Sequence, residues 1–148
     1  AFQKGPFLRR DAARKLTKRL IKTLSISTPS PYIAVQKLSG GNVQKVLLGR
    51  EIDAAPRVLI TAYPVRGLDI GSSMTIYDLL IEQKNNGVGV LYVGEDLDVL
   101  LELCDRIMVL CQGRVTAIVK AGEATKEQLG LYMTGAQEKP QGEEGETA

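Results

Sequence analysis

The sequence predicts an α/β protein with a mostly parallel sheet, helices on both faces of that sheet and a hairpin near the C-terminus. Two continuous apolar runs, residues 58–62 and 88–93, have the composition of strands that are covered on both faces. A helical stretch separates them, which is typical of a parallel strand–helix–strand unit. Residues 107–111 and 115–119 are joined by a two-residue link that suits a hairpin. So few strands leave such a sheet short of core.

The N-terminal part of the chain predicts two helices. Asp11 is the expected N-cap of the first, which covers roughly residues 12–24. Its apolar residues recur every four positions, at Leu8, Ala12, Leu16, Leu20 and Leu24. A breaker segment rich in serine and proline follows over residues 25–31, and a second helix is expected over residues 41–53, before Pro56.

The remaining elements follow from turn and cap signals. Ser72 or Ser73 is the expected cap of a helix that runs to about residue 86 and ends at Gly87. Asp96 is expected to open a short helix, and a last helix is expected over residues 126–133. Residues 136–148 hold four glutamates and one lysine without an apolar anchor, so this acidic tail is expected to be disordered.

Charge is distributed unevenly along the 148 residues. Residues 1–22 carry eight basic side chains against Asp11 alone, a local charge of +7 within a chain of net charge +2. A basic helix can contact nucleic acid or anionic lipid headgroups, although a solvated helix face is more common. No aromatic residues interleave with the basic ones, which disfavours stacking on single strands. No nucleic-acid partner is therefore expected.

The amino-acid composition limits the classes of protein to which this chain can belong. Hydrophobic residues make up 44% and charged residues 24%, as in an ordinary soluble domain or a piece of one. The chain has no apolar run long enough to span a bilayer and no histidine. Cys104 and Cys111 have no zinc-site spacing, so no metal site is expected and free thiols in a reducing cytosol are the simpler account.

Residues 38–45, Leu-Ser-Gly-Gly-Asn-Val-Gln-Lys, are the most informative stretch. Ser39 is a suitable N-cap, and the two glycines let backbone N–H groups approach a ligand closely. With the helix dipole behind them, these donors form an anion site suited to a terminal phosphate. An ordinary capped helix after a Gly-Gly turn is the alternative. The stretch closely resembles the signature motif of ATP-binding cassette (ABC) proteins, in the form seen in sugar and nucleoside importers.

The resemblance extends from about Phe7 to Gly135 in the right order. Residues 56–69 look like a Walker B strand that runs into a D-loop, and residues 104–115 resemble the segment that follows the switch histidine in ABC domains. Thr28-Pro29-Ser30-Pro31 and residues 95–98 are similar to the second cassette of nucleoside and simple-sugar importers. The resemblance implies a partial P-loop NTPase fold. It also implies a helical subdomain and signature helix over residues 1–55, and a Walker B to C-terminal segment over residues 56–135.

Three departures from the family pattern decide the expected mechanism. The chain has no Gly-x-x-x-x-Gly-Lys-[Ser/Thr] phosphate loop, which family members carry upstream, so the chain is expected to be truncated before the signature motif. Ala62-Tyr63 stands where the family has Asp-Glu, and neither side chain ligates magnesium or acts as a base at neutral pH. Glu95 replaces the switch histidine.

These losses all fall in one of the two composite sites that a pair of cassettes forms. The resemblance implies that Ser39, Gly40, Gly41 and Asn42 contact ATP held mainly by a partner cassette, while Gly67, Leu68 and Asp69 of the D-loop reach across the interface. By the same resemblance the chain's own positions Ala62, Tyr63 and Glu95 are degenerate. We therefore expect no catalytic residue and no ligation of magnesium in this chain, which is expected to be inactive alone although the full subunit would be an ATPase.

The implied setting is an importer at the cytoplasmic face of the cell membrane. The implied partners are a second cassette, membrane-spanning permease subunits and, indirectly, a substrate-binding protein. Tyr63 is expected to be packed at a strand end, whereas Arg66 has either an interface role or none. Two alternatives remain open: a non-transporter ABC-type regulatory module, which the basic N-terminal helix favours, and a degraded reading frame without function as a separate chain.

Overall fold

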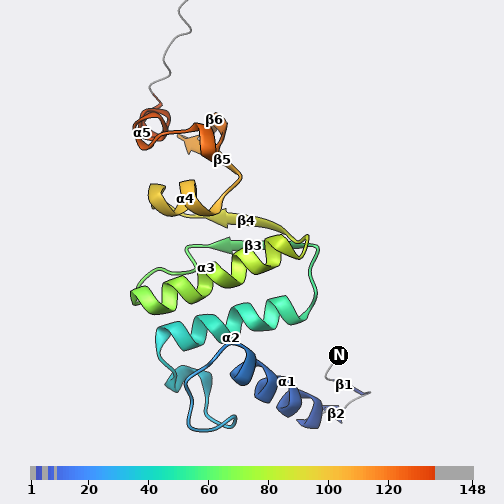
Figure 1. Cartoon of the computed structure of the whole chain (residues 1–148). Coiled ribbons are helices and arrows are strands. Elements are labelled where there is room, and N and C mark those ends of the chain that lie inside the picture. The colour runs from blue at the N-terminus through green and yellow to red at the C-terminus, as the bar shows by residue number, and fades with distance from the viewer. Residues whose placement is uncertain (1–2, 5–6, 9, 136–148) are drawn as a thin grey trace, which may run out of the picture. The chain divides into compact units, whose positions relative to one another are not determined.

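The computed structural model of the chain describes residues 3–4, 7–8 and 10–135 and divides the chain into two compact units, Ala1–Val93 and Gly94–Ala148 (Figure 1). The acidic tail that is predicted to be disordered lies outside the described residues, as do several positions before Arg10. Among the described helices, none combines the length and the apolar character needed to cross a bilayer.

The first unit contains most of the helices. In chain order its elements are β1 (Gln3–Lys4), β2 (Phe7–Leu8), α1 (Arg10–Thr23), the 3₁₀ helix η1 (Val35–Lys37), α2 (Gly40–Asp53), β3 (Val58–Ala62), α3 (Ile70–Asn85) and β4 (Gly89–Val93). Strands β1 and β2 pair antiparallel, and β3 and β4 pair parallel. The predicted strand–helix–strand unit is therefore confirmed, with α3 as its crossover.

The core of the first unit lies on one side of the β3–β4 sheet. Leu59 of β3 is buried with Leu48 of α2 and with Ile76 and Leu80 of α3, and partly buried apolar residues of β4 pack against them. The parallel register pairs Val58 with Gly89 and Ala62 with Val93, so alternate residues of both strands face this core. The hydrophobic effect therefore holds α2 and α3 against the same sheet face.

The sequence predicts helices on both faces of this sheet, but no described helix of the first unit covers the second face. Val58, Ile60, Leu91 and Val93 are exposed, Ile60 to 67%. The continuous apolar runs have the composition of strands with two covered faces. The described helices of this unit cover one face only, so alternate apolar side chains of both strands meet solvent. We call these four side chains the open sheet face.

Two predicted helix caps are wrong, and a third is confirmed in position only. Asp11 is not the N-cap of α1 but its second residue, where it pairs with Arg14 at 3.5 Å and adds negative charge to the first turn. Helix α3 is capped by Asp69 rather than by Ser72 or Ser73. Ser39 occupies the predicted N-cap position of α2, but its side chain makes no capping hydrogen bond.

The second unit contains α4 (Leu97–Leu103), β5 (Arg106–Cys111), β6 (Arg114–Lys120), η2 (Ala121–Glu123) and α5 (Lys126–Thr134). The predicted hairpin is confirmed: β5 and β6 pair antiparallel, and Gln112 and Gly113 both have positive φ, as a tight hairpin turn requires. Leu129 of α5 is 0% exposed in the core of this unit. Side chains on the other face of the hairpin, Met108, Leu110, Val115 and Ile118, are exposed.

Candidate functional site

The N-terminus of α2 carries the stretch that the sequence singles out. Ser39 has an extended backbone and Gly40 is the first helical residue. The first N–H groups of a helix have no partner within the helix, and together they carry the positive end of its dipole. The Ser39 side chain makes no hydrogen bond to them, and its hydroxyl oxygen instead accepts a hydrogen bond from Asn42 Nδ2 at 2.8 Å. The helix start therefore keeps its backbone donors uncapped by this side chain.

Asn42 ties the helix start to the segment that follows α1. Its Oδ1 accepts a hydrogen bond from the Ser27 N–H at 2.8 Å, while its Nδ2 donates to Ser39. Both ends of the amide are thus engaged inside the chain. A contact between Asn42 and ATP stays a prediction, and the structure gives this residue an internal task that the sequence did not reveal.

Gly41 lies directly against α3. A Cβ at this position would be 2.7 Å from Ser72 Cβ and closer still to Ser72 Oγ, which is nearer than real Cβ atoms approach other heavy atoms. At Gly40, which is exposed, a Cβ would be 3.3 Å from the end of the Leu68 side chain. Gly41 is therefore required by packing within the chain, whereas Gly40 remains open toward solvent.

Asp69 and Ser72 form the other half of this contact. One carboxylate oxygen of Asp69 accepts the Ser72 N–H at 2.9 Å and the other accepts the Ser72 hydroxyl at 2.7 Å. Gly67, with φ +74°, provides the turn before them. The structure thus brings Gly40 and Gly41 together with Leu68 and Asp69. It adds Ser72, which sequence reasoning had considered only as a cap.

The hydrogen bonds from Ser72 lower the pKa of Asp69 below its ordinary value of 3.8, the backbone N–H first and the hydroxyl second. A depressed carboxyl pKa stabilises the folded state above the unfolded pKa, and this contribution is lost as pH falls through the folded pKa. We expect an NMR titration of the Asp69 carboxyl to show the low value. In Ser72→Ala the pKa should rise only part of the way, because the backbone donor remains. An unchanged pKa in that variant would contradict the role of the hydroxyl.

The end of β3 holds the predicted degenerate positions. Ala62 is exposed. Tyr63 has φ +49° and is 42% exposed, so the expectation that it is packed is wrong. Its N–H donates to the Val93 carbonyl at 2.8 Å, and the guanidinium of the exposed Arg66 lies 5.9 Å from its ring centroid. A bulky residue with positive φ is unusual and stores strain. No carboxylate stands at either position.

Glu95 belongs to the second unit, near its start, and is exposed. The next residue, Asp96, caps α4 by accepting the N–H groups of Asp98 at 3.0 Å and Val99 at 3.4 Å, as predicted. Within the described part of the chain, no group of three or more His, Cys, Asp or Glu side chains is arranged to hold a metal ion.

Comparison with known proteins identifies the relatives of this chain. No family model matches it. It is 42% identical over 128 residues to the guanosine import ATP-binding protein NupO of Bacillus subtilis (strain 168), covering 86% of this chain and 25% of the relative. It is 35% identical over 135 residues to the ribose import ATP-binding protein RbsA of Oceanobacillus iheyensis, covering 91% and 27%. The chain thus spans about a quarter of the length of these relatives.

Solved structures agree on the fold. An inward-facing structure of a putative metal-chelate type ABC transporter matches 82% of this chain and 48% of its own, with a TM-score of 0.70 and 15% identity. A dimeric bacterial ABC transporter cassette matches 80% of this chain and 51% of its own, with a TM-score of 0.65 and 24% identity. At such identities the likeness concerns the fold alone.

Proposed function

We propose, from the premise that this chain is a homologue of sugar and nucleoside import ATP-binding proteins with part of the ABC cassette fold, that it presents its signature helix to ATP held by a second cassette. Residues 38–45 are this helix start. In this role the chain supplies backbone donors to a phosphate that another polypeptide, or another part of the same one, binds first. It takes no part in cleaving the phosphate itself.

The observation that carries the proposal is the N-terminus of α2. Its first-turn N–H groups are not capped by Ser39, and Ser39 and Gly40 are exposed. Leu68 and Ser72 lie against the two glycines and fix the backbone from behind. Donors that are held in place before a ligand arrives stabilise developing negative charge without rearrangement. This arrangement supports binding of a terminal phosphate at the helix end.

The residues at the chain's own nucleotide site support the part of the proposal that denies it catalytic activity. Ala62 and Tyr63 offer no carboxylate at the end of β3, and Glu95 offers an acceptor where a donor to phosphate is needed. Magnesium prefers oxygen ligands such as carboxylates, which Ala62 lacks and a neutral Tyr63 phenol does not replace. We therefore assign ATP and its metal to the partner cassette and assign no catalytic residue here.

The wider assembly follows from the names of the relatives. They are import ATP-binding proteins for guanosine, ribose and other sugars. We therefore propose a nucleoside or simple sugar as the transported class. Permease subunits and a substrate-binding protein are the proposed partners, and the cytoplasmic face of the membrane is the proposed location.

Isothermal calorimetry on the chain tests this division of labour. We expect no micromolar binding of ATP and no hydrolysis, with or without magnesium, because the phosphate loop is absent from the sequence. Micromolar affinity, or magnesium-dependent turnover that survives Ser39→Arg, would show that the chain has a nucleotide site of its own. The proposal would then be wrong.

A further inference from the structure

We infer that the exposed side of α1, together with Tyr32, is a surface that binds anionic lipid headgroups. The proposed function places a membrane nearby, and the inference rests on it for that point alone. The contact itself is argued from the charges and the packing of this chain. We call the exposed cationic side of α1 the basic face, and Tyr32 lies beside it.

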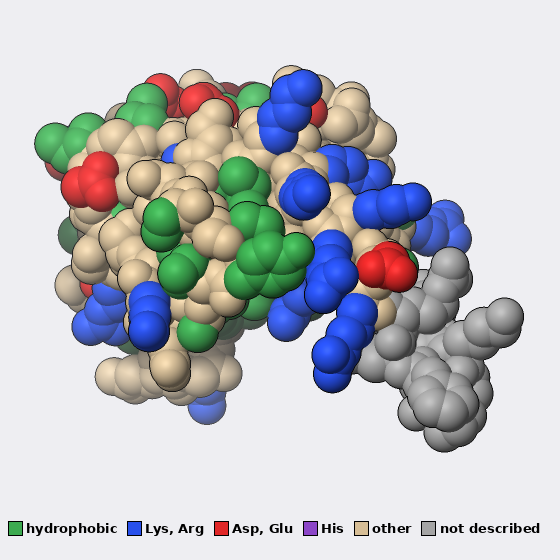
Figure 2. All heavy atoms as spheres, turned by 90° about the horizontal axis from the view of Figure 1, so that it is seen from below, with side chains coloured by type: hydrophobic (Ala, Val, Ile, Leu, Met, Phe, Trp, Pro, Cys, Tyr) green, Lys and Arg blue, Asp and Glu red, His purple; other side chains and the backbone are tan. Residues whose placement is uncertain are grey.

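The basic face occupies about half of the circumference of α1. At 3.6 residues per turn, its cationic residues fall within one half of the helix, and all of them are exposed: Arg10, Arg14, Lys15, Lys18, Arg19 and Lys22. The opposite half carries Leu16 and Leu20, and Leu20 and Leu24 lie against Gly49 of α2. The helix is therefore held in the unit by its apolar side while its basic side faces outward, as Figure 2 shows.

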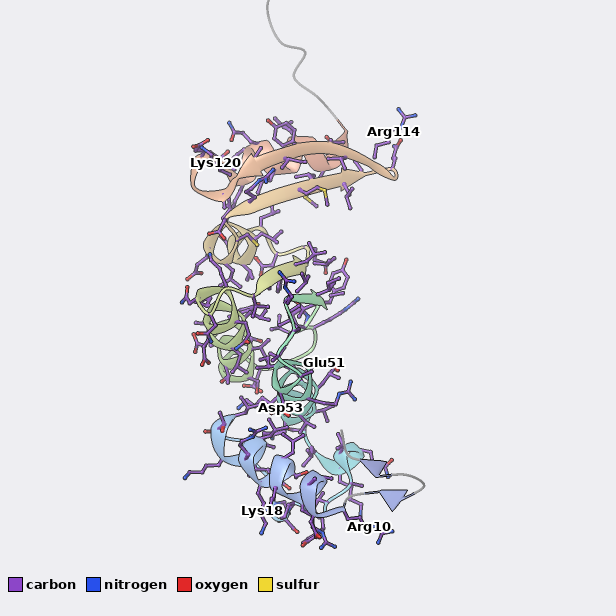
Figure 3. The ribbon with its side chains drawn as sticks, turned by 90° about the vertical axis from the view of Figure 1, so that its right-hand side faces the viewer. Arg10, Lys18, Glu51, Asp53, Arg114 and Lys120 are labelled. Carbon is purple, nitrogen blue, oxygen red and sulfur yellow. The ribbon has the colours of Figure 1, made fainter. Side chains whose placement is uncertain are left out.

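Most of these cations have no structural task. Arg14 pairs with Asp11, and Arg19 pairs with Asp53 at the C-terminal end of α2. Arg10, Lys15, Lys18 and Lys22 have no ion-pair partner among the described residues. In Figure 3, Arg10 and Lys18 project from α1, and Glu51 and Asp53 lie on α2. Four unpaired cations on one helix side repel one another, so an anionic surface would relieve an unfavourable interaction.

The fold adds an aromatic residue that the sequence pattern did not place there. Tyr32 follows the breaker segment, is 69% exposed, and has the Arg14 guanidinium 5.5 Å from its ring centroid. Val35 of η1 is exposed as well. Tyrosine beside lysine and arginine is the combination that is enriched at the headgroup level of membranes. Polybasic segments are attracted to anionic leaflets over about one Debye length.

A lipid surface explains these observations better than nucleic acid does. Binding of single strands uses open aromatic faces on which bases stack, and Arg14 already lies over the Tyr32 ring. The cations follow one straight helix, which a flat surface meets along its whole length. Moreover, the relatives are import proteins, whose work takes place at a membrane.

Co-sedimentation of the 148-residue chain with vesicles tests the inference. Vesicles of phosphatidylcholine are compared with vesicles that also contain phosphatidylserine, at several salt concentrations. We expect binding only with phosphatidylserine, falling as salt rises. Lys15→Gln/Lys18→Gln/Lys22→Gln should weaken it on the order of 100-fold. The matched control, Arg106→Gln/Arg114→Gln/Lys120→Gln, removes the same charge from the hairpin and should change it by less than a few-fold.

Three outcomes would overturn the inference. Equal binding to both vesicle types would show that the chain binds lipid through exposed apolar side chains. An equal loss of binding in both triple variants would show that binding depends on net charge and not on the basic face. Tighter binding to a single-stranded oligonucleotide than to vesicles at the same salt would favour a nucleic-acid partner. The two vesicle types and the oligonucleotide are compared with the unmodified chain, so the first and third outcomes test the inference even if a variant fails to fold. Failure here leaves the ATP result unchanged, since calorimetry does not involve α1.

Discussion

Gly41→Ala should lower the free energy of unfolding of the first unit by about 2–3 kcal/mol, although alanine is the better helix former. The added Cβ would lie 2.7 Å from Ser72 Cβ, an atom fixed to the backbone of α3. The Ser72 hydroxyl is also held, because it donates to Asp69 at 2.7 Å. Relief therefore requires α2 and α3 to separate, which loosens the packing around Leu48 and Ile76.

Urea unfolding followed by circular dichroism measures this effect, and two further variants assign it. Ser72→Gly in the Gly41→Ala background removes the atoms that clash and should restore most of the lost stability, a coupling that a double-mutant cycle quantifies. Gly40→Ala is the matched control, since its Cβ meets only the mobile end of Leu68 at 3.3 Å. If Gly41→Ala is as stable as the unmodified chain, the close contact with Ser72 is not a constraint.

A second large effect is expected on ATP turnover once the chain is part of a complete subunit paired with a second cassette. Gly40→Asp should reduce turnover by about 100-fold or more, because a carboxylate at the helix start would oppose the γ-phosphate and displace the backbone donors. Gly41→Asp should nearly abolish turnover, but the clash with Ser72 contributes to that loss. Gly40, being exposed, gives the cleaner measurement.

The comparison variants change the degenerate positions, to which we assign no role in ATP hydrolysis. Glu95→Gln and Tyr63→Phe should change steady-state turnover by no more than a few-fold, since neither side chain is given a catalytic role. All variants are measured in the same assembled transporter. If Gly40→Asp turns over normally while Glu95→Gln or Tyr63→Phe is inactive, the proposal is wrong: the degenerate positions would then be needed for turnover and the signature helix would not.

Local pattern is sufficient to predict the order and type of the five α-helices and of strands β3 to β6, but it misses β1, β2 and the two 3₁₀ helices. The β3–β4 unit, the hairpin turn at Gln112 and Gly113, and the helix that ends before Gly87 all follow from periodicity and turn residues. Caps were harder, because several short polar residues compete at each helix start. At α3 the pattern predicts Ser72 or Ser73, but the cap is Asp69, whose carboxylate accepts both hydrogen bonds that Ser72 donates.

Contacts between distant positions could not be predicted from local pattern. Gly41 and Ser72 meet only because α2 and α3 pack on the same sheet face, and no spacing in the sequence indicates it. Tyr32 reaches the basic face for a similar reason, since the breaker segment turns back toward α1. The apolar composition of β3 and β4 likewise indicates that both faces of the sheet are suited to burial. It does not indicate which face the described helices cover.

Because of the open sheet face, the measured stability of this chain should depend on the protein concentration. Each unit exposes apolar strand residues, Ile60 and Leu91 in the first and Met108 and Leu110 in the second. Side chains of this kind associate in water, and association of folded chains shifts the folding equilibrium by an amount that grows with protein concentration. The melting temperature of the chain should therefore rise with its own concentration, so no single value describes it.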